Sequence, residues 1–268
     1  MAASEGVDLE WAIVNLISPT SESMKRTYSS TIKAQADKCV AHIMKEAGNK
    51  PVEAWHSDDP KNPAGAAIFA KPEPKTDVVI KIGSKVYYTS VKMAGGVQLA
   101  SGQGSSTAEL FAAASKHLGG AKSKVLESII KELKSMPTRL LSESNKQRIL
   151  KEASPKIINE FLNKGKIIND KSYEVWLMNN KPFLMESLIK YVDSDLDFFA
   201  ALIYEAMSGE ETLKQYKGAV ADSIISPSGF HEIDIGYVHS ILHKIKLDVR
   251  GKSRSGITGL AFRIDYTP

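Results

Sequence analysis

The stretch Thr76–Gln103 reads TDVVIKIGSKVYYTSVKMAGGVQLASGQ and contains the strongest strand pattern in this chain. Its first part, Asp77–Ile82, is mostly Val and Ile, and Lys85–Lys92 is rich in the β-branched and aromatic residues that strands favour. Gly83–Ser84 lies between them and predicts a two-residue turn, so the two segments should form a β-hairpin. Val97–Ser101 is expected to be a third strand.

Three polar side chains should meet at the open end of this hairpin. Asp77 begins the first strand and Lys92 ends the second, at similar separations from the turn, so the two residues should lie side by side. Ser90 alternates with Val91 and therefore shares the sheet face of Lys92. Directly opposed residues have Cβ atoms about 5 Å apart, so the heads of Asp77 and Lys92 are expected within about 8 Å of each other.

A carboxylate, a hydroxyl and an ammonium group at one edge of a sheet are suited to phosphodiester hydrolysis. This reaction uses a divalent cation to neutralise developing charge and to activate water. Mg²⁺ takes one or two carboxylates together with water and phosphate oxygens. Asp77 is the candidate ligand for Mg²⁺ or Mn²⁺, and Lys92 is the candidate group that stabilises charge.

The hairpin resembles the PD-(D/E)xK nuclease superfamily, which includes many restriction endonucleases. That family pairs an Asp on one strand with (D/E)-x-K on the next, within an α-β-β-β-α-β core. Helices expected at Ser21–Ala47 and Ser106–His117, with the strands between them, fit this order. The resemblance implies a mixed α/β fold, with a restriction-endonuclease-like central sheet flanked by helices and a helical insertion. It also implies a metal-dependent endonuclease that hydrolyses DNA.

The sequence departs from the family pattern at two positions. Thr76 stands where the family has Pro, and Ser90 stands at the middle acidic position, so one metal ligand is missing. Some restriction enzymes of the superfamily have S-x-K with the acidic residue moved to the following helix, which makes Glu109 the second candidate metal ligand. Three upstream residues are further candidates: Glu22, Glu46 and Glu53.

Other polar residues are candidates for contact with a nucleic acid. The resemblance implies that Gln98, just past Lys92, lies near the phosphate. Gln103 and Ser105 belong to a Gly/Ser loop before a helix, whose free backbone N–H groups could hold a phosphate. A second Gly/Ser loop, near the C-terminus, is basic and could also reach phosphates; its residues are Arg250, Lys252 and Arg254. An ordinary helix lead-in and a solvated hairpin loop are the competing interpretations.

The remaining chain is expected to be mainly helical and then to return to strands. Helical periodicity dominates from residue 121 to about residue 215. Strand patterns return in three segments: Ala219–Ile225, Lys244–Val249 and Gly259–Tyr266. We therefore expect one mixed α/β domain with an inserted helical subdomain. Its parts are a nuclease-like core over 1–120, a helical insertion over 121–215, and C-terminal strands over 216–268 that complete the core.

Composition sets wide limits on partners and compartment. The 35 Lys and Arg against 31 Asp and Glu leave a net charge of +4, which permits nucleic-acid binding without requiring it. The single cysteine, Cys39, excludes an internal disulfide, and the acidic N-terminal segment does not match a signal peptide, so a cytoplasmic location is expected. No apolar run approaches the about 18 residues of a membrane span.

A non-catalytic descendant of the nuclease fold is the competing hypothesis. Taken singly, Asp77 is explained as a turn residue and Lys92 as a solvated edge-strand residue. Such a protein would act as a nucleic-acid-binding or virion-associated structural protein. Asp197–Glu211 (DFFAALIYEAMSGEE) is expected in the core and resembles EAM-x-G-E segments of phage-encoded proteins. Oxygens of Glu109, Glu22, Glu46 or Glu53 within about 5 Å of the Asp77 carboxylate would favour the nuclease, because one Mg²⁺ could then be shared. Asp77 alone at the site would favour the non-catalytic protein. Cleavage of both DNA strands would favour a homodimer.

Overall fold

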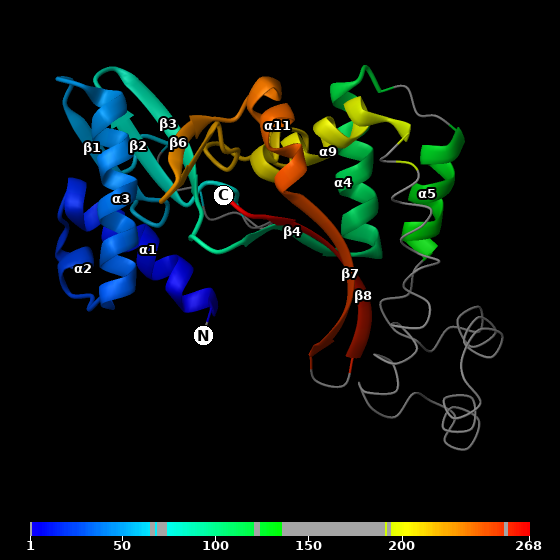
Figure 1. Cartoon of the computed structure of the whole chain (residues 1–268), viewed down its shortest axis with the longest axis horizontal. Coiled ribbons are helices and arrows are strands. Elements are labelled where there is room, and N and C mark those ends of the chain that lie inside the picture. Colours follow the sequence, from blue (N-terminus) through cyan, green and yellow to red (C-terminus); the bar gives the residue numbers. More distant parts are fainter. Residues whose placement is uncertain are drawn as a thin grey trace. The chain divides into compact units, whose positions relative to one another are not determined.

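The computed structural model describes residues 2–64, 68, 74–120, 124–135, 191, 194–254 and 257–268. The chain forms two compact units (Figure 1). The first consists of residues 1–97, 203–245 and 266–268, and the second of residues 98–202 and 246–265. These boundaries differ from the three consecutive segments expected from sequence, because both units are built from stretches far apart in the chain.

The first unit is built on a five-stranded sheet with the order β1-β2-β3-β5-β6. The strands are β1 (Val52–His56), β2 (Val78–Ile82), β3 (Lys85–Val91), β5 (Ser223–Ser226) and β6 (Gly229–Glu232). All neighbours are antiparallel except β3 and β5, which are parallel. A parallel pair requires a crossover connection, and here the chain makes it over a long excursion through residues 92–222.

The predicted hairpin is confirmed. Strands β2 and β3 are antiparallel, with Ile82 opposite Lys85, so Gly83 and Ser84 form the two-residue turn. Gly83 has φ +61°, which a residue without a Cβ adopts at little cost and which tight hairpin turns require. The register is therefore set locally, and it brings the start of β2 beside the end of β3.

Two long helices cover one face of this sheet. They are α1 (Ala2–Ile17) and α3 (Ser30–Ala47), with a short α2 (Ser21–Met24) between them. The single helix expected over Ser21–Ala47 is therefore wrong in extent. The chain leaves the helix after α2 and starts α3 anew at Ser29, whose side chain accepts a hydrogen bond from the Ile32 backbone N–H, as an N-cap does.

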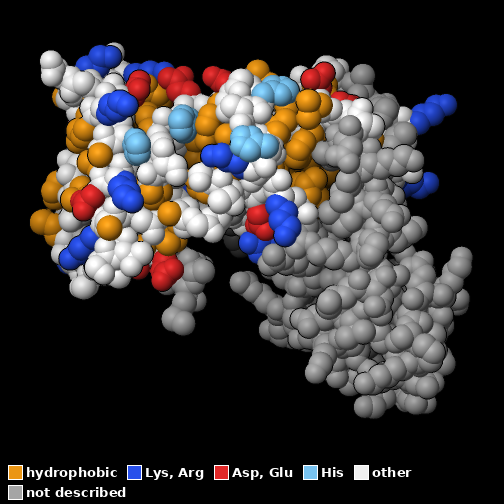
Figure 2. Space-filling model, viewed as in Figure 1, with side chains coloured by type: hydrophobic (Ala, Val, Ile, Leu, Met, Phe, Trp, Pro, Cys, Tyr) orange, Lys and Arg blue, Asp and Glu red, His pale blue; other side chains and the backbone are white. Residues whose placement is uncertain are grey.

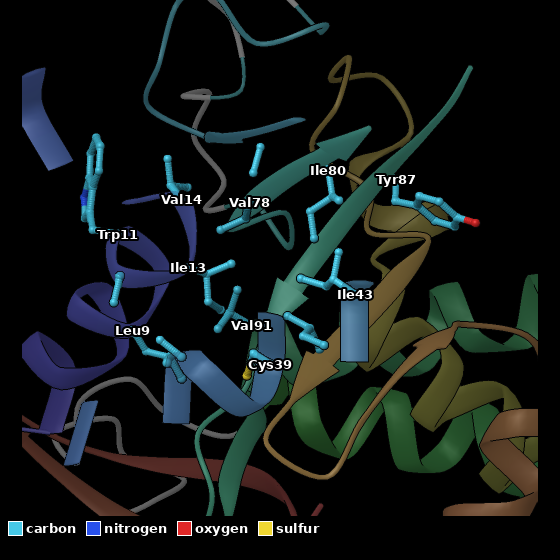
Figure 3. Close-up of a cluster of buried hydrophobic side chains, with 14 of the residues drawn as sticks. Leu9, Trp11, Ile13, Val14, Cys39, Ile43, Val78, Ile80, Tyr87 and Val91 are labelled. Carbon is cyan, nitrogen blue, oxygen red and sulfur yellow. The ribbon is translucent and has the colours of Figure 1, made fainter. Parts of the chain in front are cut away.

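The hydrophobic core of the first unit lies between these helices and the sheet. Figure 3 shows Leu9 and Ile13 of α1 with Ile43 of α3, beside Val78 and Ile80 of β2. All five side chains are fully buried. The sheet's other face packs a second cluster that includes Val79, as the alternation of a strand requires. Helix α1 is thereby fixed against the sheet, so polar residues on α1 have defined neighbours at the strand ends.

The second unit holds most of a three-stranded sheet with the order β4-β8-β7. Its strands are β4 (Val97–Gln103), β7 (Ile245–Arg254) and β8 (Ile257–Tyr266), and the described helices nearby in sequence are α4 (Gly104–His117), α5 (Lys124–Ser135) and α9 (Leu196–Ser208). The Phe111 ring lies 5.6 Å from the rings of Phe198 and Phe262, centroid to centroid, which joins α4, α9 and β8.

Several sequence expectations are revised by this arrangement. The strand expected at Val97–Ser101 exists, but it pairs with β8 and not with the hairpin. Of the C-terminal strands, β5 joins the hairpin's sheet, whereas β8 pairs with β4 on one side and with β7 on the other. Strand β6, the short helices α10 (Glu210–Leu213) and α11 (Ile235–Ile241), and a 3-10 turn (Leu242–Lys244) were not anticipated.

Much of the expected helical insertion, residues 136–190, lies outside the described residues. Its described parts, α5 and α9, are helical as predicted. None of the described helices combines the length and the apolar composition that crossing a bilayer would take.

Candidate active site at the open end of the hairpin

The ends of four strands are joined by backbone hydrogen bonds at one end of the five-stranded sheet. The Ser57 N–H, just past β1, donates to the Asp77 carbonyl at 3.0 Å, and the Asp77 N–H donates to the Thr89 carbonyl at 2.9 Å. The Lys92 N–H, just past β3, donates to the Ile225 carbonyl of β5 at 2.8 Å. Asp77 and Lys92 are thus held by the sheet ladder itself, although each lies one residue outside its strand.

The Asp77 carboxylate is fixed by three contacts, all made through Oδ2 among the residues that the structure describes. The Ser90 hydroxyl donates to Oδ2 at 3.1 Å and the Val91 backbone N–H donates at 2.7 Å. Lys92 Nζ lies 3.9 Å from the same oxygen. The prediction that these three side chains meet at the open end of the hairpin is confirmed. Their partial exposure, 26% for Asp77 and 18% for Lys92, leaves them accessible to small ligands.

A second carboxylate, Glu10, reaches this end of the sheet from helix α1. Its Oε2 lies 3.0 Å from Nε2 of His56, the last residue of β1, and its side chain is only 15% exposed. Burial raises the pKa of Glu10, and the nearby negative charge of Asp77 raises it further, whereas the His56 hydrogen bond and the positive charge of Lys92 lower it. Glu10 therefore interacts electrostatically with both members of the Asp77–Lys92 pair.

The acidic residues expected to complement Asp77 lie elsewhere. Glu22 is more than half exposed and forms ion pairs with Lys25 and Arg26. Glu53 pairs with Lys81 at 3.0 Å on the sheet. Glu46 is exposed on α3. No described contact joins any of these three candidates to Asp77. The carboxylate that reaches the open end of the hairpin is Glu10, which α1 carries.

The remaining candidates belong to the second unit. Glu109 is exposed on α4 and Gln98 is exposed on β4. Gln103 ends β4 and Ser105 lies in the first turn of α4, so the expected loop is shortened to a direct strand-to-helix junction. Three basic residues lie within β7 and not in a loop: Arg250, Lys252 and Arg254. The side chains of Gln103, Ser105 and these three fall outside the described residues.

Neither Glu10 nor His56 was predicted as a site residue, although the apolar residues around Glu10 make its position unusual for a carboxylate. It lies within VDLEWAIVNLI, where Leu9 and Trp11 on either side are buried in the core. A carboxylate placed inside such a run is costly unless it has partners. His56 has no spacing that marks a site, and only the pairing of β1 with β2 brings it beside Asp77.

The described residues offer few ligands for a metal ion. The described residues contain no group of three or more His, Cys, Asp or Glu side chains arranged to hold a metal ion. Mg²⁺ does not need one, because it commonly uses one or two carboxylates and fills its other positions with water and phosphate oxygens. Asp77 and Glu10 are the carboxylates at this end of the sheet, and the negative charge of Asp77 contributes to the raised pKa of Glu10, after burial.

The described surface does not indicate which class of ligand the protein binds. On the face shown in Figure 2, acidic and basic side chains are interspersed and do not form one broad basic patch. Comparisons with protein-family models, with curated proteins and with solved structures find no match to this chain. What the protein does must therefore be inferred from the chemistry of its own residues.

Replacing Glu10 by Gln is expected to stabilise the folded protein at neutral pH. The folded-state pKa of Glu10 lies above its ordinary value of 4.5, so this group's contribution to stability is full below that value and is lost as the pH rises through the folded pKa. The glutamine would keep an oxygen to accept from His56 but could not ionise. Urea unfolding between pH 4 and pH 8 should show the advantage of Glu10→Gln growing with pH.

The matched control for this measurement is Glu46→Gln, which removes an exposed carboxylate from α3. Its stability relative to the wild type should change little over the same pH range, because an exposed carboxylate is well solvated in both states. A Glu10→Gln protein whose advantage shrinks as the pH rises would contradict the assignment of Glu10 as a destabilised buried carboxylate.

Proposed function

We propose that this protein is a Mg²⁺-dependent endonuclease that hydrolyses DNA phosphodiester bonds at the open end of the hairpin. The observation that carries the proposal is the convergence of Asp77, Lys92 and Glu10, a fixed carboxylate, an ammonium group and a second, buried carboxylate. An Asp77–Lys92 ion pair with a purely structural role would not require Glu10 nearby, because burying the Glu10 carboxylate destabilises the folded protein. A largely buried carboxylate with a raised pKa is a candidate for a functional site.

The order of elements supports the proposal. Helices α1 and α3 precede three consecutive antiparallel strands, β1, β2 and β3, and the helices α4, α5 and α9 precede β5, which pairs parallel with β3. With β4 set aside, which lies between β3 and α4 and belongs to the other sheet, this order is consistent with the α-β-β-β-α-β order implied by the resemblance to the PD-(D/E)xK nucleases. The structure differs from the sequence expectation in the identity of the strands: β1 takes the place that had been expected of Val97–Ser101.

Each residue has a distinct role in the proposed reaction. Bound Mg²⁺ would neutralise charge on the phosphate and lower the pKa of a water molecule. Asp77 Oδ1 and the Glu10 carboxylate would hold the cation, since Asp77 Oδ2 is engaged by Ser90, Val91 and Lys92. Lys92 would stabilise the negative charge that develops on the phosphate oxygens.

Ser90 has a different role from the acidic residue of the family motif. Its side chain is almost fully buried and its hydroxyl donates to Asp77, so it orients the carboxylate and adds no negative charge. In this proposal Glu10 supplies the charge that Ser90 does not. Glu109 belongs to the second unit and has no part in this proposed site.

Incubating the purified protein with supercoiled plasmid tests the proposal. Cleavage is expected with Mg²⁺ or Mn²⁺ and none with EDTA, because the two carboxylates need a dication to bind a phosphate. Nicked circles alone would indicate one site acting on one strand at a time, and linear product formed without a nicked intermediate would indicate two copies acting together.

The substitution of Ser90 for an acidic residue favours one alternative, a nuclease fold that binds nucleic acid without cutting it. Salt-dependent DNA binding without cleavage, over many substrates and with both cations, would support that alternative and contradict the endonuclease. A role as a virion-associated structural protein would then be the next hypothesis to test.

A further inference from the structure

His56 is almost completely buried, with a side-chain exposure of 4%, and both of its ring nitrogens have partners. The Asp58 backbone N–H donates to Nδ1 at 3.1 Å. A neutral imidazole has one donor and one acceptor nitrogen, so an accepting Nδ1 places the proton on Nε2. Nε2 lies 3.0 Å from Glu10 Oε2 and therefore donates to it.

The His56 ring is also fixed in its plane. It stacks on the Trp11 indole, with the ring centroids 4.1 Å apart and the planes 7° from parallel. The Arg26 guanidinium lies 4.6 Å from the centroid of the same indole ring. Among the described residues, Trp11 Nε1 has no hydrogen-bond partner, so Trp11 contributes its ring face and no polar contact.

Trp11 and Glu10 are consecutive residues of α1, so the stack and the hydrogen bond tie α1 to the end of β1 at one place. His56 pairs with Val78 across the sheet, and the next residue, Ser57, is hydrogen-bonded to Asp77. The end of β1 therefore contacts both acidic residues. The Ser57 N–H binds the backbone carbonyl of Asp77, and the His56 ring binds the side chain of Glu10.

We propose that His56 is a positioning residue whose Nε2–H holds the Glu10 carboxylate at the open end of the hairpin, where Glu10 and Asp77 share one divalent cation. This inference rests on the proposed function. Without the hydrogen bond, Glu10 would have several rotamers available, and the cation would lose an oriented ligand. His56 itself touches neither the cation nor the substrate.

The Asp58 carboxylate is the other charged group beside His56. Its Oδ1 lies 3.4 Å from Nδ1, and its side chain is about half exposed. The Asp58 backbone N–H directs its hydrogen at the same ring nitrogen, so the backbone and not the carboxylate sets the tautomer. His56 contacts Glu10 directly, and the charges of Asp77 and Lys92 also act on the Glu10 carboxyl.

The test compares two variants by Mn²⁺ binding in the full-length protein. His56→Phe keeps an aromatic ring for Trp11 but has no donor, whereas His56→Gln keeps a donor near the Nε2 position but has no ring. Loss of such an orienting partner typically costs 10- to 100-fold in metal affinity, so we expect about that loss for His56→Phe and less than about threefold for His56→Gln. His56→Leu, a smaller side chain without a donor, repeats the test should Phe not be accommodated.

Each result decides for or against the inference. Equal Mn²⁺ affinity of His56→Phe and the wild type would overturn it, and so would an equal loss in His56→Phe and His56→Gln, because the stack and not the donor would then matter. An Nδ1–H tautomer in the ¹⁵N NMR spectrum of the metal-free wild type would also overturn it. Wild-type protein that shows the expected His56 dependence of Mn²⁺ binding, yet never cleaves DNA, would contradict the proposed function alone.

Discussion

Asp77→Asn is expected to abolish DNA cleavage and to leave the fold intact. The asparagine would keep one oxygen that can accept from the Val91 N–H, so the hydrogen bond that fixes this side chain to β3 is preserved. The substitution removes the negative charge that the proposed cation requires. Charge stabilisation by a catalytic metal is worth several kcal/mol, so the rate should fall by about a thousandfold or more.

Asp222→Asn is the matched control for this experiment. Asp222 also precedes a strand, β5, and its Oδ1 accepts a hydrogen bond from a backbone N–H of β3, that of Tyr88, at 2.8 Å. It therefore reproduces the structural role of Asp77 without Lys92 or Glu10 beside it. Plasmid cleavage with Mg²⁺, Mn²⁺ binding and thermal unfolding should be measured for both variants. Full cleavage by Asp77→Asn, or equal loss in both variants, would contradict the proposed site.

Lys92→Met is expected to slow cleavage strongly while leaving Mn²⁺ binding close to that of the wild type. Methionine keeps most of the side chain's apolar length but removes the ammonium group that lies 3.9 Å from Asp77 Oδ2. An ammonium group stabilises charge on the reacting phosphate and does not coordinate the cation. Removing one such group from an active site costs about 100- to 1,000-fold in rate, and we expect a loss of that size in kcat.

Lys85→Met provides the comparison within the same strand. Lys85 begins β3, at the turn, and pairs with Glu232 of β6, whereas Lys92 follows the end of β3 and pairs with Asp77. The Lys85 pair is more than half exposed, and exposed pairs contribute little to stability. Lys85→Met should cleave like the wild type. A Lys92→Met protein that loses Mn²⁺ binding as completely as Asp77→Asn would show that Lys92 shapes the cation site and does not act on the phosphate.

The local part of the site could be predicted from the sequence. Alternating β-branched residues on either side of Gly83–Ser84 specify two strands and a tight turn, and these signals depend only on residues close together in the chain. The hairpin register then follows, so Asp77, Ser90 and Lys92 had to meet at its open end. The helical patterns of α3, α4 and α9 are likewise local and were found, apart from the break between α2 and α3.

Only the tertiary structure decided which distant residues join that end of the sheet. Glu10 is separated from Asp77 in the sequence by α2, α3 and β1, and it arrives there because α1 packs on α3 and β1. His56 depends on the pairing of β1 with β2. The strand pattern at Val97 was correct, but its partner is β8, since a strand's pattern reports its faces and not its neighbours. Which strands pair depends on contacts between residues far apart in the sequence, and the local sequence carries little information about those contacts.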